Sequence, residues 1–259
     1  MCFDPDSRPP IPPIAGGALE SRRTILTAAD GNRLAAFEAR ATTPTGGAML
    51  ILPDVRGLHA YYEELALRFA EHGVDALAID YFGRTAGAEA RPDTFEYRPH
   101  VNQTTWAGLE VDIRSGFEAL CAGHDEAARR CFTVGFCFGG RLAFLAATLG
   151  LDLAGVIGFY GTLLGEHHNG SPAPVDVAGS MRGRLLGIFG GADASITPAS
   201  IDTFGASLTN AGIDHRLITY AGTPHSFFDR KAADYADESA AAWAETMRFV
   251  REGVDGPPA

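Results

Sequence analysis

The stretch 134–140, which reads V-G-F-C-F-G-G, restricts the fold of this chain more than any other segment. An apolar run, 131–136, leads into the cysteine, and a helix-like pattern, 141–146, follows it. A strand, the sequence G-x-C-x-G and a helix together form the cysteine version of the nucleophile elbow, whose tight turn lifts the nucleophile above a sheet. Such a turn leaves no room for a Cβ atom two residues before or after Cys137, which explains the glycines. The backbone N–H of Phe138 then lies at a helix N-terminus, where developing negative charge is stabilised.

A cysteine nucleophile needs a base, and the base needs an acid that orients it. Asp193 follows the strand candidate 185–189, and His225 follows the strand candidate 216–220. Alone, each has an ordinary explanation: a buried inert cysteine, a turn aspartate after two glycines, and a surface histidine. All three come after the carboxyl ends of strands, in the order nucleophile, acid, histidine that α/β-hydrolases use. The sequence therefore predicts a Cys137–Asp193–His225 triad.

Apolar patterning along the chain alternates between strand-like and helix-like segments. The strand candidates are 23–27, 34–38, 48–52, 74–79, 131–136, 154–159, 185–189 and 216–220, and the helix candidates are 62–73, 104–120, 141–146, 198–211 and 232–251. The first two strands flank an Asp30-Gly31 turn, which is typical of a hairpin, and Thr104 is the expected cap of its helix. This alternation predicts an α/β fold, specifically an α/β-hydrolase fold, with a mostly parallel central sheet and helices on both faces. We expect a single domain over 21–252, a proline-rich extended arm at 1–20 and a tail at 253–259.

Composition narrows the classes of function. The formal net charge of −11 argues against a protein built mainly to bind nucleic acid. The four cysteines are sparse and show no C-x-x-C pair, so they predict neither a zinc ribbon nor a disulfide framework and fit a reducing compartment. No signal peptide and no apolar run of membrane-spanning length is present, so we expect a cytoplasmic protein without a membrane partner. The adjacent pair His167-His168 is the weak metal candidate; exposed loop histidines explain it better, and no metal is expected.

The strand candidate 48–52 ends at P-D-V-R-G, which is residues 53–57. In this fold the loop after that strand supplies the second N–H of the oxyanion hole, and Val55 is our candidate beside Phe138. Asp54 would then lie near Cys137 as an additional carboxylate. The alternative is an aspartate that only leads into the next helix.

Five segments together resemble the dienelactone hydrolase family, whose members are carboxymethylenebutenolidase-like α/β-hydrolases. They are 53–57, 80–84, 135–140, 190–193 and 222–227, in the family's order, and the likeness covers about residues 20 to 252. The resemblance implies the same triad and makes Arg84 the arginine that holds a substrate carboxylate, with Tyr81 and Phe82 as neighbouring substrate-binding residues. Two positions depart from the best-known members: Asp54 replaces a glutamate, and Asp229 stands beside Arg230 where a second carboxylate-binding arginine is expected.

The predicted activity is hydrolysis of a small carboxylic ester or dienelactone-like lactone through a cysteine acyl-enzyme, with no cofactor, by a monomer or small homo-oligomer. Three alternatives stay open. The chain could be a general carboxylesterase of the same family with another substrate. It could be a non-hydrolytic redox sensor using Cys137, with Cys131 or Cys121 approaching it in the fold. It could also be a binding protein on an inactive hydrolase fold.

Overall fold

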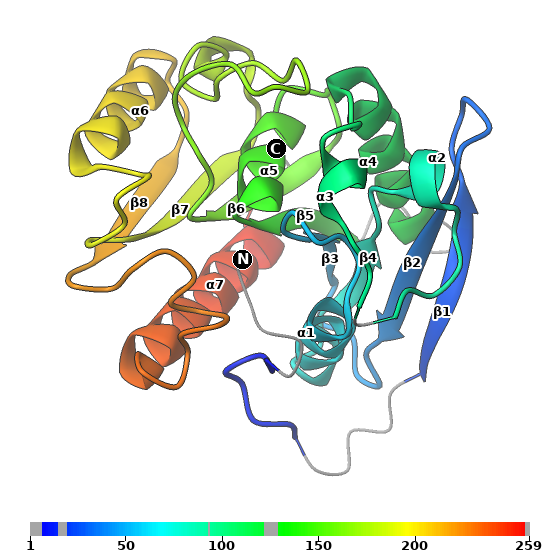
Figure 1. Cartoon of the computed structure of the whole chain (residues 1–259). Coiled ribbons are helices and arrows are strands. Elements are labelled where there is room, and N and C mark those ends of the chain that lie inside the picture. The colour runs from blue at the N-terminus through cyan, green and yellow to red at the C-terminus, as the bar shows by residue number, and fades with distance from the viewer. Residues whose placement is uncertain (1–6, 15–19, 93, 122–128, 257–259) are drawn as a thin grey trace.

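A twisted eight-stranded sheet lies between two layers of helices in the computed structural model, which describes residues 7–14, 20–92, 94–121 and 129–256 (Figure 1). The strands are β1 (Glu20–Thr27), β2 (Arg33–Arg40), β3 (Gly47–Leu52), β4 (Asp75–Ile79), β5 (Arg130–Phe136), β6 (Leu153–Phe159), β7 (Arg184–Gly190) and β8 (His215–Tyr220). Their spatial order is β1-β2-β4-β3-β5-β6-β7-β8. Strands β3 to β8 run parallel, so their carboxyl ends meet at one edge of the sheet.

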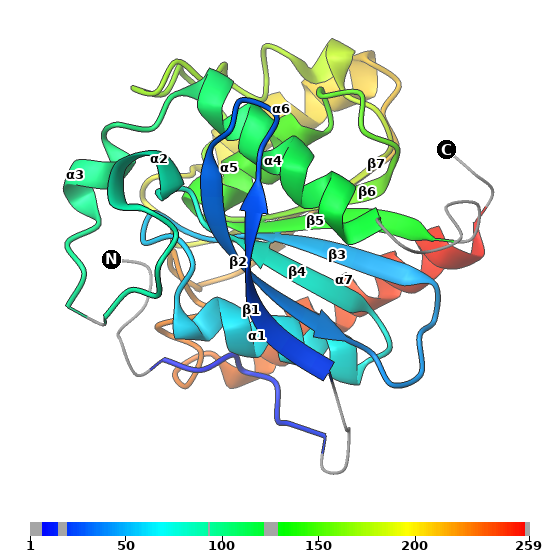
Figure 2. The same cartoon turned by 90° about the vertical axis from the view of Figure 1, so that its right-hand side faces the viewer.

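The antiparallel part of the sheet is the β1–β2 hairpin, in dark blue at the near edge in Figure 2. The turn closes with a hydrogen bond of 2.8 Å from the Ala28 N–H to the Asn32 carbonyl, and Gly31 adopts a positive φ of 84°. A left-handed backbone at that position favours glycine over residues with a Cβ. The predicted hairpin is thereby confirmed.

Helices cover both faces of the sheet. On one face lie α1 (Ala60–Glu71) and α7 (Ala236–Asp255); on the other lie α4 (Trp106–Cys121), α5 (Phe138–Ala146) and α6 (Pro198–Asn210) (Figure 1). The short elements are α2 (Gly83–Ala86), α3 (Arg98–Val101) and the 3₁₀ turn η2 (Ala178–Ser180). Because both faces are covered, β3, β4 and β6 are buried along their whole length, which explains their continuous apolar runs.

Details at the helix ends and chain termini differ from the prediction. Helix α4 is capped by Thr105, whose side-chain oxygen accepts a 3.2 Å hydrogen bond from the Gly108 N–H, and the Thr104 hydroxyl instead donates to Val101. The last helix continues to Asp255, where we expected a tail from 253, because Gly253 packs tightly against Phe132.

The described part of the amino-terminal arm, residues 7–14, lies against α1. Ile11 is buried, the Ile14 N–H donates to Glu71 across 3.1 Å, and Arg8 pairs with Glu64 at 2.9 Å. No helix among the described residues is long and apolar enough to cross a membrane.

Candidate active site

Cys137 occupies the sharp turn between β5 and α5, with φ 55° and ψ −111°. A Cβ added to Gly135 would lie 1.9 Å from the Gly139 carbonyl oxygen, and one added to Gly139 would lie 2.0 Å from the Leu52 carbonyl oxygen. Any side chain at either position would collide with backbone, so the predicted reason for both glycines is confirmed. The backbone N–H of Cys137 donates to the Phe159 carbonyl at 3.0 Å, which fixes the turn to the neighbouring strand β6.

Asp193 and His225, the predicted acid and base, are hydrogen-bonded to each other at the same edge of the sheet. The Nδ1 atom of His225 lies 2.6 Å from Oδ2 of Asp193. The other carboxylate oxygen accepts hydrogen bonds from the Ser195 N–H at 2.8 Å, the Ser195 hydroxyl at 2.6 Å and the Ile196 N–H at 3.3 Å. Burial acts to raise the pKa of Asp193, but the bonds from His225 and Ser195 outweigh it and hold that pKa below its usual value. The acid is therefore an ionised partner that fixes the histidine ring.

Tyr160, directly after β6, lies beside the predicted base and follows the residue that binds the backbone of the predicted nucleophile. The residue before it accepts the Cys137 N–H, and its own ring centroid lies 4.8 Å from that of His225. Cys137, Tyr160 and Ser226 are the non-glycine residues with positive φ in the described ranges, at 55°, 38° and 64°. Backbone held in such sparsely populated conformations is concentrated at functional sites, and here all three positions belong to, or adjoin, the predicted triad.

Asp229 is a second carboxyl group close to His225, and it differs from Asp193. It is 3% exposed, and one oxygen accepts a 2.6 Å hydrogen bond from the Tyr160 hydroxyl while the other accepts the N–H of Arg230. Burial raises the pKa of Asp229 to about 8, although the Tyr160 bond acts to lower it. At neutral pH this carboxyl therefore keeps its proton for most of the time.

Asp54 is fully buried at the turn after β3. Its Oδ1 accepts the Arg56 N–H at 2.8 Å, and its backbone N–H donates to the Tyr62 hydroxyl at 3.0 Å. Burial raises the pKa of Tyr81, and the charges of Asp54, Asp80 and Cys137 raise it further. The charges of Asp54 and Cys137 thus act on the same Tyr81 hydroxyl, and the predicted role of Asp54 beside Cys137 stays a prediction.

The two predicted oxyanion-hole donors come from different elements. Phe138 is the first residue of α5, so its N–H lies at the helix N-terminus. Val55 is half-buried in a turn that is closed by a 3.1 Å hydrogen bond from the Gly57 N–H to the Asp54 carbonyl. That turn is fastened to the end of β4, because the Asp80 carboxylate accepts the Leu58 N–H at 2.9 Å. The roles of both N–H groups stay predictions.

Arg84, predicted to bind a substrate carboxylate, already pairs with two carboxylates of this chain. Its guanidinium lies 2.5 Å from Asp30 in the hairpin turn and 2.8 Å from Asp112 on α4. These contacts fasten α2 to the hairpin and to α4, so a structural role explains the residue without any substrate.

The two aromatic neighbours of Arg84 in the sequence lie differently from each other. Tyr81 packs edge-on against Phe138 at 5.5 Å, and its hydroxyl donates to the Pro53 carbonyl at 2.9 Å. Phe82 is fully buried against Phe95 at 5.9 Å, so it supports the segment that carries Phe95. Tyr81 is thus the one placed beside the elbow.

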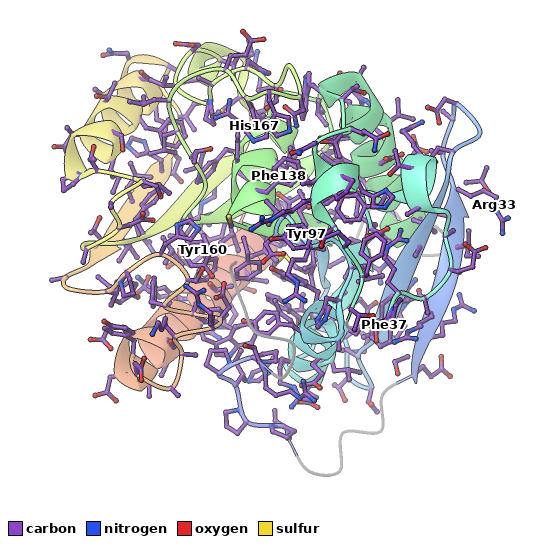
Figure 3. The ribbon with its side chains drawn as sticks, viewed as in Figure 1. Arg33, Phe37, Tyr97, Phe138, Tyr160 and His167 are labelled. Carbon is purple, nitrogen blue, oxygen red and sulfur yellow. The ribbon has the colours of Figure 1, made fainter. Side chains whose placement is uncertain are left out.

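Figure 3 shows Phe138, Tyr160 and His167 on one side of the molecule, far from Arg33 on the hairpin. The His167 ring lies 5.5 Å from the ring of Phe138, and burial, followed by the adjacent His168, lowers the pKa of His167. Of the predicted pair His167-His168, His167 is therefore held in its neutral form, with its ring tilted against that of Phe138 on the elbow helix. Among the described residues, no cluster of three or more possible metal ligands is found.

A buried arginine that the sequence analysis did not single out holds the segment with His167. Arg141 on α5 is 2% exposed, and its guanidinium donates to the carbonyls of Gly165 at 2.7 Å, Ser171 at 3.1 Å and Pro172 at 2.8 Å. The sequence does carry a signal for this arginine, because it is the one charged residue in an otherwise apolar helix pattern. Tyr160 gave no such signal, because only the fold brings its ring to His225.

Comparisons with known proteins bear on the family and the fold. The model of the "Dienelactone hydrolase family" matches residues 34–253. A Yersinia pestis protein named "Putative carboxymethylenebutenolidase" is 27% identical over 234 residues, covering 88% of this chain and 87% of the relative.

Two of the similar solved structures each cover most of this chain. One, titled "Putative Dienelactone Hydrolase" from Klebsiella pneumoniae, has a TM-score of 0.77 at 24% identity and covers 91% of this chain and 99% of that chain. A "Dienelactone Hydrolase-like Promiscuous Phospotriesterase P91" from metagenomic libraries has a TM-score of 0.72 at 22% identity, with the same coverage. At these identities the likeness establishes the fold alone, which is the predicted α/β-hydrolase fold.

Proposed function

This chain belongs to the dienelactone hydrolase family and is an ester or lactone hydrolase, and from that premise we propose that it works through a thioester on Cys137. The observation that carries the proposal is the common sheet edge. Cys137 sits in the elbow after β5, and the Asp193–His225 pair, with its 2.6 Å contact, follows β7 and β8. Tyr160 contacts the base and follows the strand to which the nucleophile is hydrogen-bonded.

In the first half of the reaction the sulfur of Cys137 attacks the acyl carbon, and its proton passes to His225. A C–S bond forms, and the N–H groups of Phe138 and Val55 hold the oxyanion. The C–O bond to the leaving group then breaks, and His225 returns the proton to the departing alkoxide or enolate. The product is a thioester and a free alcohol or enol.

In the second half water replaces the leaving group. His225 takes a proton from water, the hydroxide forms a C–O bond to the thioester carbon, and the C–S bond breaks. The proton returns to sulfur, and a carboxylic acid is released. Asp193 keeps the histidine ring oriented and stabilises its charge in both halves.

A carboxylesterase acting on uncharged esters is a second candidate, favoured over a lactone that bears a carboxylate. The motivation is charge: Arg84 is paired with Asp30 and Asp112, and the position that relatives fill with arginine carries the buried Asp229. Arg84 thus already has carboxylate partners within this chain, and the buried Asp229 offers no cation to an anionic substrate.

Turnover of p-nitrophenyl butyrate by the wild type, Cys137→Ala and the matched control Cys131→Ala tests the mechanism. Loss of a triad member commonly reduces turnover by a factor on the order of a thousand or more, so Cys137→Ala should be nearly inactive. Acid quenching during turnover should give a mass adduct of one acyl group that Cys131→Ala retains and Cys137→Ala lacks. Near-wild-type turnover by Cys137→Ala would reject the proposal.

The substrate class is tested separately with a lactone that bears a carboxylate and with its methyl ester. We compare Arg84→Gln with the exposed control Arg33→Gln. If Arg84 binds the carboxylate, Arg84→Gln should lower kcat/KM about tenfold or more for the acid alone, as expected for a lost charge-assisted hydrogen bond. Equal changes for acid and methyl ester favour the uncharged ester as substrate.

A further inference from the structure

Two thiols that the proposed reaction does not use meet at the amino end of β5. Cys121 is the last residue of α4 and is half-buried, whereas Cys131, the second residue of β5, is 3% exposed. Their Sγ atoms lie 2.9 Å apart. A disulfide has an S–S distance of about 2.05 Å, so a displacement of less than about 1 Å separates the two thiols from a covalent bond.

The surroundings keep the two thiols together. The guanidinium of Arg129 contacts both the Leu120 carbonyl at the end of α4 and the Asp75 carboxylate on β4. The next residue, Arg130, donates its N–H to the Gly46 carbonyl at 2.9 Å, which fixes the start of β5 beside β3. Thus the end of the helix and the start of the strand are each held by hydrogen bonds of their own. The two sulfur atoms are therefore brought together by the surrounding backbone, not only by their contact with each other.

We propose that Cys121 and Cys131 are a disulfide-forming site that reacts with low-molecular-weight disulfides such as oxidised glutathione. The sulfur of Cys121, the more exposed of the two, attacks the small disulfide, forms a mixed disulfide and releases one small thiol. The sulfur of Cys131 then attacks the Cys121 sulfur and releases the second small thiol. Two protein thiols lose two electrons and two protons in total, and one small disulfide becomes two small thiols.

This site is separate from the catalytic cysteine, although both lie on one strand. Cys131 is near the amino end of β5, and Cys137 follows its carboxyl end six residues later. At about 3.3 Å per residue, the two residues are about 20 Å apart, so Cys131 cannot reach Cys137. Cys131 therefore cannot act as the partner thiol that a redox sensor at Cys137 would need.

The test exposes the full chain to oxidised glutathione, blocks the remaining thiols with N-ethylmaleimide in denaturant, and maps tryptic peptides without reduction. Cleavage after Arg129, Arg130 and Arg141 places Cys131 and Cys137 on the same peptide, 131–141. Cys137→Ala is therefore analysed beside the wild type, and Cys121→Ala serves as the negative control. A cross-link between peptides 115–129 and 131–141 in both the wild type and Cys137→Ala supports the site.

A second measurement is thermal unfolding before and after oxidation. A disulfide that closes the loop between Cys121 and Cys131 should raise the Tm of Cys137→Ala by on the order of 5 °C, and dithiothreitol should reverse the rise. Cys121→Ala should show no such rise under the same treatment. The proposal is overturned if Cys137→Ala yields only free thiols or glutathione adducts at Cys121 and Cys131, or if the cross-link requires Cys137.

Discussion

Asp193 is hydrogen-bonded to His225 itself, whereas Asp229 is hydrogen-bonded to Tyr160, whose ring lies beside His225. The pKa values of these two carboxyl groups shift in opposite directions. Asp193 receives hydrogen bonds from Ser195 and from the histidine, and its pKa is lowered although the carboxyl is 6% exposed. Asp229 is 3% exposed, and burial raises its pKa to about 8. Burial acts to raise the pKa of both acids, and the difference lies in how far hydrogen bonds and nearby charge offset it. The bonds from His225 and Ser195 outweigh burial at Asp193, whereas the bond from Tyr160 does not outweigh the deeper burial of Asp229.

The largest effect is expected when Asp193 loses its charge. Asp193→Asn keeps the shape but cannot hold the histidine in the productive tautomer or stabilise its positive charge, so kcat should fall on the order of a thousand-fold or more. Steady-state hydrolysis of an activated ester gives the value, and Asp202→Asn, an exposed acid on α6, is the control. A drop of less than tenfold would mean that Asp193 does not serve the base.

Asp229→Asn should instead act mainly on stability. In the folded protein Asp229 holds its proton up to about pH 8, whereas an unfolded aspartate loses it near 3.8. Raising the pH between these values therefore favours the unfolded chain, by up to about 1.4 kcal/mol per pH unit from this group. Asparagine has no proton to lose, so the stability of the variant relative to wild type should increase with pH across that window and level off above it.

Urea unfolding at pH 5, 6, 7 and 8 measures this difference for Asp229→Asn. Asp234→Asn, which removes an exposed acid of the same segment, is the matched control and should show no such trend. A difference between Asp229→Asn and wild type that does not change with pH would mean that Asp229 is ionised in the folded protein.

The smallest effect is expected at Asp54, whose charge contributes to the raised pKa of Asp229. In an Asp54→Asn background, the stability difference between Asp229→Asn and its parent should stop increasing at a lower pH. Asp54→Asn should also speed the alkylation of Cys137 a few-fold at neutral pH, because a nearby carboxylate disfavours a thiolate. Iodoacetamide labelling read by mass spectrometry measures the second effect. Asp54→Glu restores the charge and should return the labelling rate towards wild type; unchanged labelling in Asp54→Asn would make Asp54 purely structural.

Local sequence patterns predicted most of the fold because the central strands are continuous apolar runs and the elbow needs glycine at fixed positions. The same reasoning placed Cys137, Asp193 and His225 after their strands. It could not anticipate Tyr160 beside His225, since that contact depends on how β6 and β8 are spaced in the sheet. Nor could it show that the Arg84 guanidinium is taken up by Asp30 and Asp112, because pairing between distant segments leaves no trace in either segment's own pattern.

The buried Arg141 has a consequence for how this scaffold can change over generations. Its guanidinium binds carbonyl oxygens at 165, 171 and 172, which every amino acid possesses. Part of what fixes the path of that segment therefore comes from outside it, from one residue on the elbow helix, and does not depend on the side chains at these three positions. Side chains such as His167 can then be exchanged without loss of these carbonyl contacts, so the sequence of this segment can vary while its attachment to the elbow helix is kept.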